Sequence, residues 1–454
     1  MFALNKCIID FLDKVCGQIK YKNVLGNISE ELKSHIYELA EGYIERGMSE
    51  DEAVQKSVNQ MGDPVEIGKK LDKTYRPKTE WSIISLLSLM VLIGGIALFS
   101  IASDQASFMH LSHYVRSYLV YTLIGIGICT VCYFFDYTRL EKYSLPIFIG
   151  TIVFLFTIQK LGHQVNEVSY ARIGGLTFNP VSIALPLWLL SFAGLVSRWA
   201  TGSIKGMLKI LGLASLAVLT LLAQPSFSSA VLLSSGLIII ITIAVMNKEF
   251  VGNRKRILIS IYGGAALVMF SLLFRILRQG SYIANRLLVF LNPSLDPHGN
   301  GYINLLLNEV LSGAKFFGKS DNLYLTIEGI NRIALPEANT DFIFAYIVGA
   351  FGWVVGISTI IVIVLAVIRM FLATRKIRHQ YGKYLACSII SVFTLQALGN
   401  ILMNVGMAPI LGFSLPFISY GGTNFVANMA LIGVLLGVYR RKDLVMAEQG
   451  QFNV

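Results

Sequence analysis

One short stretch, LNPSLDPHGNGY at 291–302, holds a carboxylate in backbone that cannot be helical. Asp296 lies between Pro293 and Pro297, and two glycines follow. This Pro and Gly spacing indicates a tight loop. A carboxylate in a partly desolvated cleft can act as a general base, because burial raises its pKa. Asp296 is therefore a candidate base for activating a hydroxyl group. The alternative is that Asp296 only caps a turn before Pro297.

A second polar segment, LPEANTDFIFA at 335–345, comes directly before a long apolar run. Glu337, Thr340 and Asp341 stand close to the point where a helix must begin. Thr340 and Asp341 fit two roles equally well, namely capping that helix and contacting a substrate. An ionised carboxylate is costly inside a bilayer, so we expect Asp341 at the membrane interface.

A third polar segment, Ser419, Tyr420, Gly421 and Gly422, follows Pro416 near the C-terminus. Two glycines after a proline indicate unwound or re-entrant backbone. Such backbone is tolerated at membrane depth only inside protein or along a cavity. We therefore expect this segment to form a wall of a site.

Other polar or reactive side chains lie inside apolar stretches. Gln396 and Asn400 are one helical turn apart, which predicts that both face the interior of a helix bundle. Cys129 and Cys132 lack a second pair and a nearby histidine, so packing is favoured over zinc binding. His35 has no clustered ligand partner either, which favours a partly buried helix histidine. The sequence predicts no protein metal site.

The composition predicts the kind of element that must position these residues. The chain has 454 residues, of which 54% are hydrophobic and 14% charged, and its mean hydropathy is +0.63. Soluble domains carry about 25% charged residues. The composition excludes an ordinary soluble enzyme and a disordered chain, and predicts an all-α polytopic membrane protein. Nucleic-acid binding is disfavoured because the basic residues lie between apolar stretches.

Ten apolar stretches are long enough to cross a bilayer, which takes roughly 20 residues. They lie near 81–101, 117–135, 143–160, 180–197, 207–223, 228–246, 256–277, 341–368, 384–403 and 423–439. With a cytoplasmic N-terminus, every inner loop is basic, as the positive-inside rule requires. We therefore expect a multi-pass membrane protein with both termini in the cytoplasm.

The expected outer side has one long segment, near 278–340, and an unusual number of basic residues. Long loops in compact proteins are usually functional or disordered. Arginine suits phosphate oxygens because its planar fork donates two hydrogen bonds. For most of these residues, anchoring to lipid headgroups is the favoured interpretation. The basic residues expected outside are Arg116, Lys160, Arg172, Arg275, Arg278, Arg286, Lys315, Lys319 and Arg332.

Residues 1–80 differ from the rest, because they carry 12 Lys and Arg and 14 Asp and Glu. Three helices are expected: one over 30–47 capped by Ser29, one beginning at a Ser49–Glu52 capping box, and one beginning at Asp63 and running to about Tyr75. The text ELKSHIYELAEGYIERGMSEDEAVQKSVNQMGDPVEI resembles the HAAS-type domain. The resemblance implies a small soluble three-helix module with a regulatory or interaction role. The expected domains are thus 1–80, a membrane domain over 81–440 and a cytoplasmic tail over 441–454.

The polar segments together resemble the SEDS family, which includes RodA, FtsW and SpoVE. The resemblance is carried by LNPSLDPHGNGY, LPEANTDFIFA and PILGFSLPFISYGGTNFVANM (409–429), and further by ARIGGLTFNPVSI (171–183) and LLAQPSFSSA (221–230). It covers roughly residues 81–440. It implies a ten-helix fold and an inverting glycosyltransferase that polymerises lipid II, a polyprenyl-diphosphate-linked disaccharide, into glycan strands on the outer face.

The resemblance also implies roles for individual residues. Asp296 falls on the family's catalytic loop aspartate, and Arg286 and Lys319 fall on basic positions of the same loop. Further substrate-binding residues are expected at Arg172, Tyr302, Glu337, Thr340, Asp341, Gln396, Asn400, Ser419, Tyr420, Gly421 and Gly422. A single-span penicillin-binding transpeptidase is the implied partner, with a regulator at the N-terminal domain. No cofactor motif is recognisable, although a divalent cation, Mg²⁺ or Mn²⁺, suits the substrate pyrophosphate.

Several family positions are changed. The family's Gln-Pro-Ser-Glu stands as Asn-Pro-Val-Ser at 179–182, and the lysine three residues later is Leu185. Asp-x-Gly-Thr stands as Ser-Phe-Ser-Ser at 226–229, Gln-Ser as Leu-Leu at 306–307, and Gly-Glu-Glu as Val-Gly-Ala at 348–350. The family glutamate and lysine, which stand here as Ser182 and Leu185, form an acidic and basic pair, and both members are changed. Loss of both members of an ion pair is less harmful than loss of one. The fold can therefore persist with altered substrate handling.

Three functions from different classes follow from this pattern. The favoured one is a peptidoglycan glycosyltransferase serving cell shape, division or sporulation. The second is a non-catalytic relative that binds lipid-linked sugar or scaffolds wall-synthesis partners, which the changed positions support. The third is a flippase for the lipid-linked precursor. Transporters usually place ionisable residues near the bilayer midplane. Spans four to six have none there, which disfavours proton-coupled transport.

Overall fold

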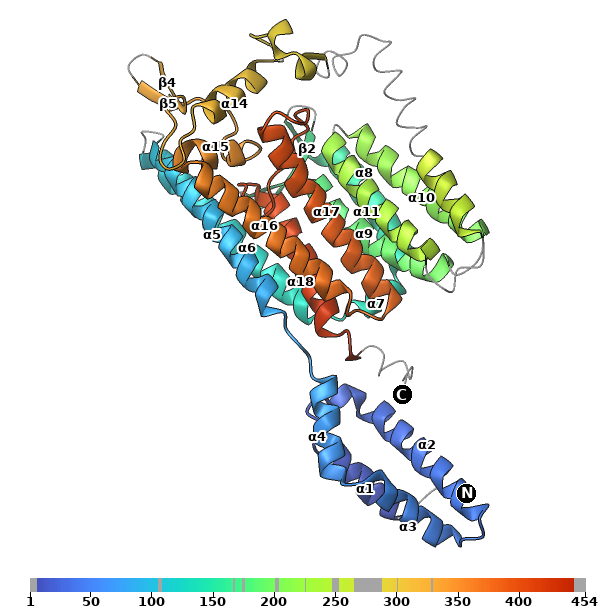
Figure 1. Cartoon of the computed structure of the whole chain (residues 1–454). Coiled ribbons are helices and arrows are strands. Elements are labelled where there is room, and N and C mark those ends of the chain that lie inside the picture. Colours follow the sequence, from blue (N-terminus) through green and yellow to red (C-terminus); the bar gives the residue numbers. More distant parts are fainter. Residues whose placement is uncertain are drawn as a thin grey trace. The chain divides into compact units, whose positions relative to one another are not determined.

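The computed structural model describes residues 6–104, 108–165, 168–173, 176–200, 204–224, 226–246, 253–264, 288–299, 301–327 and 330–444. The chain forms two compact units (Figure 1). The terminal unit comprises 1–79, 376–379 and 438–454, and the membrane unit comprises 80–375 and 380–437.

The terminal unit is built from short amphipathic helices: α1 (Lys6–Cys16), a 3₁₀ turn (Lys22–Val24), α2 (Leu25–Ile44), α3 (Glu50–Met61) and α4 (Pro64–Tyr75). Asp63 caps α4 as predicted, since its carboxylate accepts the backbone N–H groups of Val65 and Glu66. Such a cap satisfies N–H groups that have no partner within the helix. The expected count of three helices was too low, because α1 also packs into the core through Phe11 and Val15.

One expected helix start was wrong, and at a second the start is confirmed but the expected capping hydrogen bond is not seen. Helix α2 begins at Leu25, so Ser29 lies inside it rather than at its N-cap. Helix α3 does begin after Ser49, but the Ser49 hydroxyl donates to the Glu52 carboxylate (2.8 Å) instead of accepting a backbone N–H.

Residues from the far end of the sequence complete the terminal unit. Leu444 is buried in a cluster with Ile19, Val24 and Ile28. Beside it, the Asp443 carboxylate accepts hydrogen bonds from Lys78 (3.2 Å) and Lys442 (2.6 Å). Two residues of the expected tail, Asp443 and Leu444, therefore take part in the packing of the terminal unit.

The membrane unit confirms the prediction of a polytopic all-α membrane protein. Within the described residues, nine helices are long and apolar enough to cross a membrane. They are α5 (Trp81–Asp104), α6 (Phe108–Phe134), α8 (Ser144–Leu161), α9 (Pro180–Trp199), α10 (Ile204–Ala223), α11 (Phe227–Met246), α16 (Trp353–Thr374), α17 (Gln380–Asn404) and α18 (Gly422–Arg440).

Two of the ten predicted spans need comment. The span expected at 256–277 is helical over 254–264, and its remainder lies outside the described residues. The prediction of one continuous span at 341–368 was wrong. It is divided into α15 (Ile343–Phe351) and α16 by Gly352, whose φ of 95° no right-handed helix contains.

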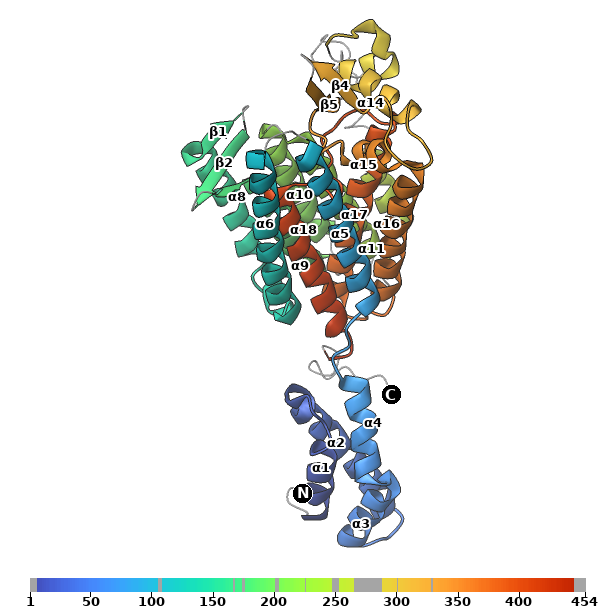
Figure 2. The ribbon, with the colours of Figure 1, turned by 90° about the vertical axis from the view of Figure 1, so that its left-hand side faces the viewer.

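Helix α9 lies at the centre of the bundle. It packs against α8, α11 and α17, and most of its length is buried. Trp188, Phe192 and Phe148 form an aromatic core there, with the two phenylalanine rings 5.4 Å apart. Figure 2 shows α9 and α18 inside the bundle, with α6 and α8 around them.

Short elements cover the ends of the helices. The strands, none of which was predicted, are β1 (His163–Val165), β2 (Val168–Ile173) and β3 (Leu176–Phe178) in one antiparallel sheet, and the hairpin β4 (Tyr324–Ile327) and β5 (Ile330–Ile333). Two short helices remain, α7 (Thr138–Glu141) and α14 (Tyr302–Ser312).

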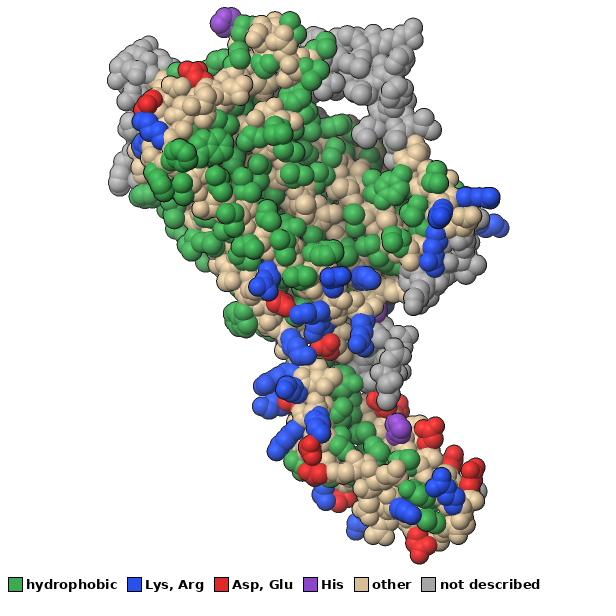
Figure 3. Space-filling model, in the orientation of Figure 1, with side chains coloured by type: hydrophobic (Ala, Val, Ile, Leu, Met, Phe, Trp, Pro, Cys, Tyr) green, Lys and Arg blue, Asp and Glu red, His purple; other side chains and the backbone are tan. Residues whose placement is uncertain are grey.

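One end of the bundle gathers basic side chains. Arg198, at the end of α9, donates to the carbonyl of Lys142 (3.3 Å). At the same end, the ring of Tyr137 packs 5.7 Å from the ring of Tyr381, at the start of α17. In Figure 3, hydrophobic side chains cover the visible face of the bundle, and Lys and Arg collect along its lower edge. The α14 and β4–β5 segments lie at the opposite end (Figure 1).

Candidate functional site

Asp296 lies in a closed loop that precedes α14. A single 3₁₀ turn, Pro293–Leu295, ends at Asp296, whose carbonyl accepts the N–H groups of Gly299 (3.3 Å) and Gly301 (2.9 Å). The half-buried carboxylate lies directly against the Cα of Gly299, where a side chain would collide with both of its oxygens. A side chain at Gly301 would meet the Pro293 carbonyl. The two glycines therefore allow the loop to fold around the carboxylate.

Helix α14 connects this loop to residues 315–320, which we call the strap. Tyr302, at the first position of α14, is exposed. Val310 and Leu323 pack at the Cα of Gly349 in α15. In the strap, the Lys319 ammonium donates to the Tyr324 hydroxyl (2.8 Å) and lies over its ring. Helix α14 thus contacts α15 through Val310, and the strap continues from its C-terminal end.

The 337–342 segment forms a turn before α15. Glu337 has a positive φ of 49°, and its carbonyl accepts the N–H groups of Thr340 (3.0 Å) and Phe342 (3.2 Å). The Thr340 hydroxyl donates to the Glu337 carboxylate (2.8 Å). Neither Thr340 nor Asp341 occupies the N-cap of α15, which is Phe342. The capping role left open for Thr340 and Asp341 is thus not seen.

A pair of buried amides from α17 holds this turn. Asn400 donates to the carbonyls of Asp341 (2.9 Å) and Phe413, and Asn404 donates to the same Asp341 carbonyl (2.9 Å). The Asn404 side-chain oxygen also accepts the N–H of Ala345 (3.0 Å) in the first turn of α15. Asn404 was not predicted. Its signal was present, since Gln396, Asn400 and Asn404 repeat every four residues within an apolar helix and so share one face.

Ser419 and Tyr420 join the C-terminal segment to the same turn. The Ser419 hydroxyl donates to the Thr340 carbonyl (2.7 Å) and accepts the N–H of Leu415 (2.7 Å). The backbone N–H of Tyr420 donates to the Asn339 carbonyl (2.8 Å). The segment is non-helical from Pro409 to Gly421, and Ser419 and Tyr420 attach it to the turn before α15.

The start of α18 contacts β3. Gly422 packs against the ring of Tyr121 in α6, and the Tyr121 hydroxyl donates to the Thr177 carbonyl (3.4 Å). The Thr423 hydroxyl accepts the N–H of Asn179 (3.0 Å). Arg172, exposed on β2, is the register partner of Thr177. Arg172 is thus one strand away from the 419–423 segment.

Asp341, in the turn that precedes the eighth span, is a carboxylate strongly affected by its surroundings. Burial and, to a lesser degree, the nearby Glu337 carboxylate raise the pKa of Asp341 to about 6. One of its oxygens would lie 3.4 Å from a side chain added at Gly412, so the left-handed backbone there (φ 68°) approaches the carboxylate closely. A carboxyl group with this pKa exchanges protons near neutral pH.

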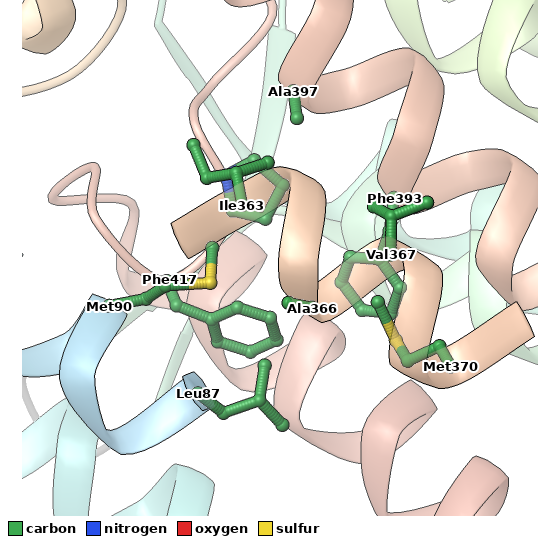
Figure 4. Close-up of a pocket in the computed structure, with 10 residues that line it drawn as sticks. Leu87, Met90, Ile363, Ala366, Val367, Met370, Phe393, Ala397 and Phe417 are labelled. Atoms are coloured by element: carbon green, nitrogen blue, oxygen red, sulfur yellow. The ribbon is translucent and has the colours of Figure 1, made fainter. Parts of the chain in front are cut away.

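Gln396 is buried one turn before Asn400, and within the described parts of the chain its side-chain oxygen has no hydrogen-bond partner. On the adjacent face of α17, Phe393 and Ala397 line an apolar pocket (Figure 4). The walls of this pocket carry no polar side chain. It is lined by Leu87, Met90, Ile363, Ala366, Val367, Met370, Phe393, Ala397, Pro416 and Phe417.

The structure therefore groups most of the predicted site residues in two places. Glu337, Thr340, Asp341, Asn400 and the 419–422 segment are joined by hydrogen bonds at the start of α15. Asp296, Tyr302 and Lys319 follow one another along the loop, α14 and the strap. Arg286 lies outside the described residues. At the changed family positions on α9, Val181 and Leu185 are buried apolar side chains.

A bound cation would find few ligands in the described part of the chain. There, no group of three or more His, Cys, Asp or Glu side chains is placed to hold a metal ion. Cys129 and Cys132 lie against the Cα of Gly433, where α6 and α18 pack closely.

Comparison with known proteins covers the whole of the membrane unit. The family model FTSW_RODA_SPOVE, described as "Cell cycle protein", matches residues 80–444. A "Probable peptidoglycan glycosyltransferase FtsW" of Geobacter sulfurreducens is 27% identical over 376 residues, covering 80% of this chain and 95% of the relative. The protein of the same name from Idiomarina loihiensis is 26% identical and covers 73% of this chain and 80% of the relative.

Two solved structures share the fold. A chain described under "Structural coordination of polymerization and crosslinking by a peptidoglycan synthase complex" is 20% identical, with a TM-score of 0.65, and covers 80% of this chain and 98% of its own length. The rod shape determining protein RodA of Thermus thermophilus is 17% identical, with a TM-score of 0.56, and covers 80% of this chain and 97% of its own.

Proposed function

Because the chain belongs to the FtsW/RodA/SpoVE family, we propose that it is a peptidoglycan glycosyltransferase that polymerises lipid II. The observation that supports a retained activity is the placement of Asp296. Its carboxylate is held by a loop whose backbone closes around it, at the end of the bundle opposite the basic loops.

We assign Asp296 the role of general base. In the proposed reaction, the acceptor sugar hydroxyl attacks the anomeric carbon of the donor sugar, and the bond from that carbon to the pyrophosphate oxygen breaks. The hydroxyl proton passes to the Asp296 carboxylate, and the anomeric configuration inverts. The leaving pyrophosphate gains negative charge, which nearby ammonium or guanidinium groups stabilise. Lys319 and Arg172 are the described basic residues proposed for this role.

The proposed orientation follows from the charge distribution. The end of the bundle that includes Lys142 and Arg198 is basic. It faces the cytoplasm, as the positive-inside rule requires, so both termini are cytoplasmic. The Asp296 loop and the strap then face outward, where a translocated lipid-linked substrate presents its sugars. A penicillin-binding transpeptidase is the proposed partner, since one neighbour in fold comes from a complex that coordinates polymerisation and crosslinking.

Polymerisation of labelled lipid II by the purified chain, with and without a transpeptidase partner, tests this proposal. We expect wild type to form polymer and Asp296→Asn to lose at least about 100-fold in rate, because general bases contribute about 10²–10⁴-fold. Glu309→Gln, an exposed carboxylate on neighbouring α14, is the matched control and should retain activity. Equal rates for Asp296→Asn and wild type would remove Asp296 from this role.

One observation favours a second candidate function. Val181 and Leu185 are buried and apolar where the family pattern has neighbouring polar groups, so the wall formed by α9 offers a substrate no charge there. A non-catalytic relative that binds lipid-linked sugar fits this feature. Saturable binding of lipid II without polymer under any partner would favour that function.

A further inference from the structure

The strap, residues 315–320, is fixed by backbone hydrogen bonds to both helices that meet at Gly352. The N–H groups of Trp353 and Val354, in the first turn of α16, donate to the carbonyls of Lys315 (3.0 Å) and Phe316 (3.2 Å). In the reverse sense, the N–H groups of Gly318 and Ser320 donate to the carbonyls of Phe351 (3.2 Å) and Gly349 (2.6 Å). Backbone groups at helix ends lack intrahelical partners, and the strap supplies them.

Gly352 is the residue that makes this contact possible. Its φ is 95°, and a side chain there would collide with the Phe316 carbonyl and approach the Cα of Phe317. The backbone of the two phenylalanines therefore lies directly on the break between α15 and α16. Their position relative to the eighth span is fixed by the fold.

Despite this fixed backbone, the two phenylalanine side chains point away from the protein. Phe316 is 81% exposed and Phe317 is 71% exposed. Phenylalanine is normally among the most buried residue types, so an adjacent exposed pair needs an explanation. Basic residues flank the pair. The Lys315 ammonium pairs with Asp321 (2.7 Å), and Lys319 contacts Tyr324.

The length of α16 indicates where Phe316 and Phe317 lie relative to the bilayer. The helix has 22 residues. At about 1.5 Å per residue, it extends about 33 Å. This length matches the roughly 30 Å hydrocarbon core of a bilayer. Arg375 follows its last turn, so Trp353 and the strap lie at the opposite boundary. Below the strap, α16 continues with exposed Ile357 and Ile361. The pair thus lies next to the end of a helix whose exposed apolar side chains face the bilayer core.

We propose that Phe316 and Phe317 insert into the headgroup and acyl boundary of the membrane in which the chain is embedded. Aromatic side chains concentrate at this boundary between the headgroups and the acyl chains. The strap is then anchored in lipid, and α14 with the preceding loop is held at the membrane surface through it. The inference concerns membrane contact and stands whether or not the chain polymerises lipid II.

Tryptophan quenching by brominated lipid tests this inference. The full-length chain carrying Phe317→Trp is reconstituted into phosphatidylethanolamine and phosphatidylglycerol vesicles, with and without bromine on the acyl chains. The fluorescence of the added tryptophan is obtained by subtracting the wild-type signal. Asp321→Trp, an exposed position just after the strap, is the matched control.

We expect the tryptophan at 317 to emit at shorter wavelength, to be quenched by brominated lipid and to be protected from aqueous iodide. The tryptophan at 321 should show the reverse. Iodide quenching of both positions to the same extent would place Phe317 in water and overturn the inference. Protection from iodide without bromine quenching would show that protein covers the pair, and would overturn it as well.

Discussion

Asp341 shows how neighbouring residues set the properties of one carboxyl group. Its carbonyl is held by two amides from α17, while its side chain faces Gly412 and the Glu337 carboxylate adds to the effect of burial on its pKa. The buried amides fix the backbone, and the side chain remains available to bind or exchange a proton. Sequence reasoning singled out Asp341 but could not choose its role, because a Thr-Asp pair before a helix fits a cap equally well.

The raised pKa of Asp341, about 6, predicts a pH-dependent contribution to stability. Between that value and the ordinary aspartate pKa of about 4, the folded chain holds a proton that the unfolded chain has released. The contribution of this group to stability is therefore largest below that window and falls as the pH rises through it. The Tm of Asp341→Asn minus the Tm of wild type, both in detergent, should therefore increase as the pH rises from about 4 to about 6 and stay constant above that.

Glu337→Gln provides the matched comparison. It removes the like charge but leaves burial unchanged, and burial is the larger cause of the raised pKa. The pH range over which the Tm falls should therefore become narrower in Glu337→Gln but should not disappear. A Tm difference between Asp341→Asn and wild type that does not vary with pH would contradict the assigned pKa.

At the scale of elements, apolar length predicted most of the membrane helices and missed the interruption of the eighth. A glycine inside an apolar run is compatible with a continuous helix. This helix is broken by the strap, a segment well before it in the sequence, which supplies partners for the free N–H and carbonyl groups. The β1–β3 sheet was missed for a related reason, because its strands are too short to show an alternating pattern.

Gly352→Ala should destabilise the top of the eighth span. A left-handed conformation costs a non-glycine residue about 1–2 kcal/mol. The new methyl group would also meet the Phe316 carbonyl. Gly127→Ala, in the middle of α6 with open space around its Cα, is the matched control. It should be neutral or slightly stabilising, because alanine favours a helix more than glycine does. Thermal unfolding in detergent measures both. Equal Tm values for the two variants would mean that the strap does not require this backbone.

At the scale of the whole molecule, composition and charge were enough to separate a charged N-terminal region from a membrane domain. They gave no sign that residues near the C-terminus complete the terminal unit, since Asp443 and Leu444 look like an ordinary solvated tail. Contacts between the two ends of a chain depend on the whole fold, and no local pattern encodes them.

Leu444→Ala tests this closure of the terminal unit. Leu444 is almost fully buried. Truncating a buried leucine typically costs about 2–5 kcal/mol. Amide hydrogen exchange should therefore accelerate around Ile19, Val24 and Ile28. Ile44 occupies an exposed position at the end of α2. Ile44→Ala should cost less than about 1 kcal/mol and leave those amides unchanged. Unchanged exchange in Leu444→Ala would show that the cluster is stable without it.

The position of Leu444 also has a consequence for biosynthesis. A ribosome releases α1–α4 first, and the core formed by these helices needs no later residue. Regions released early can fold while the rest of the chain is still being made. The cluster around Ile28, in contrast, lacks Leu444 until the membrane spans between the two have been translated and Leu444 has left the exit tunnel. Leu444 therefore packs into that cluster only after the membrane spans have been synthesised. A chain that ends before Leu444 would leave Ile19, Val24 and Ile28 without this contact.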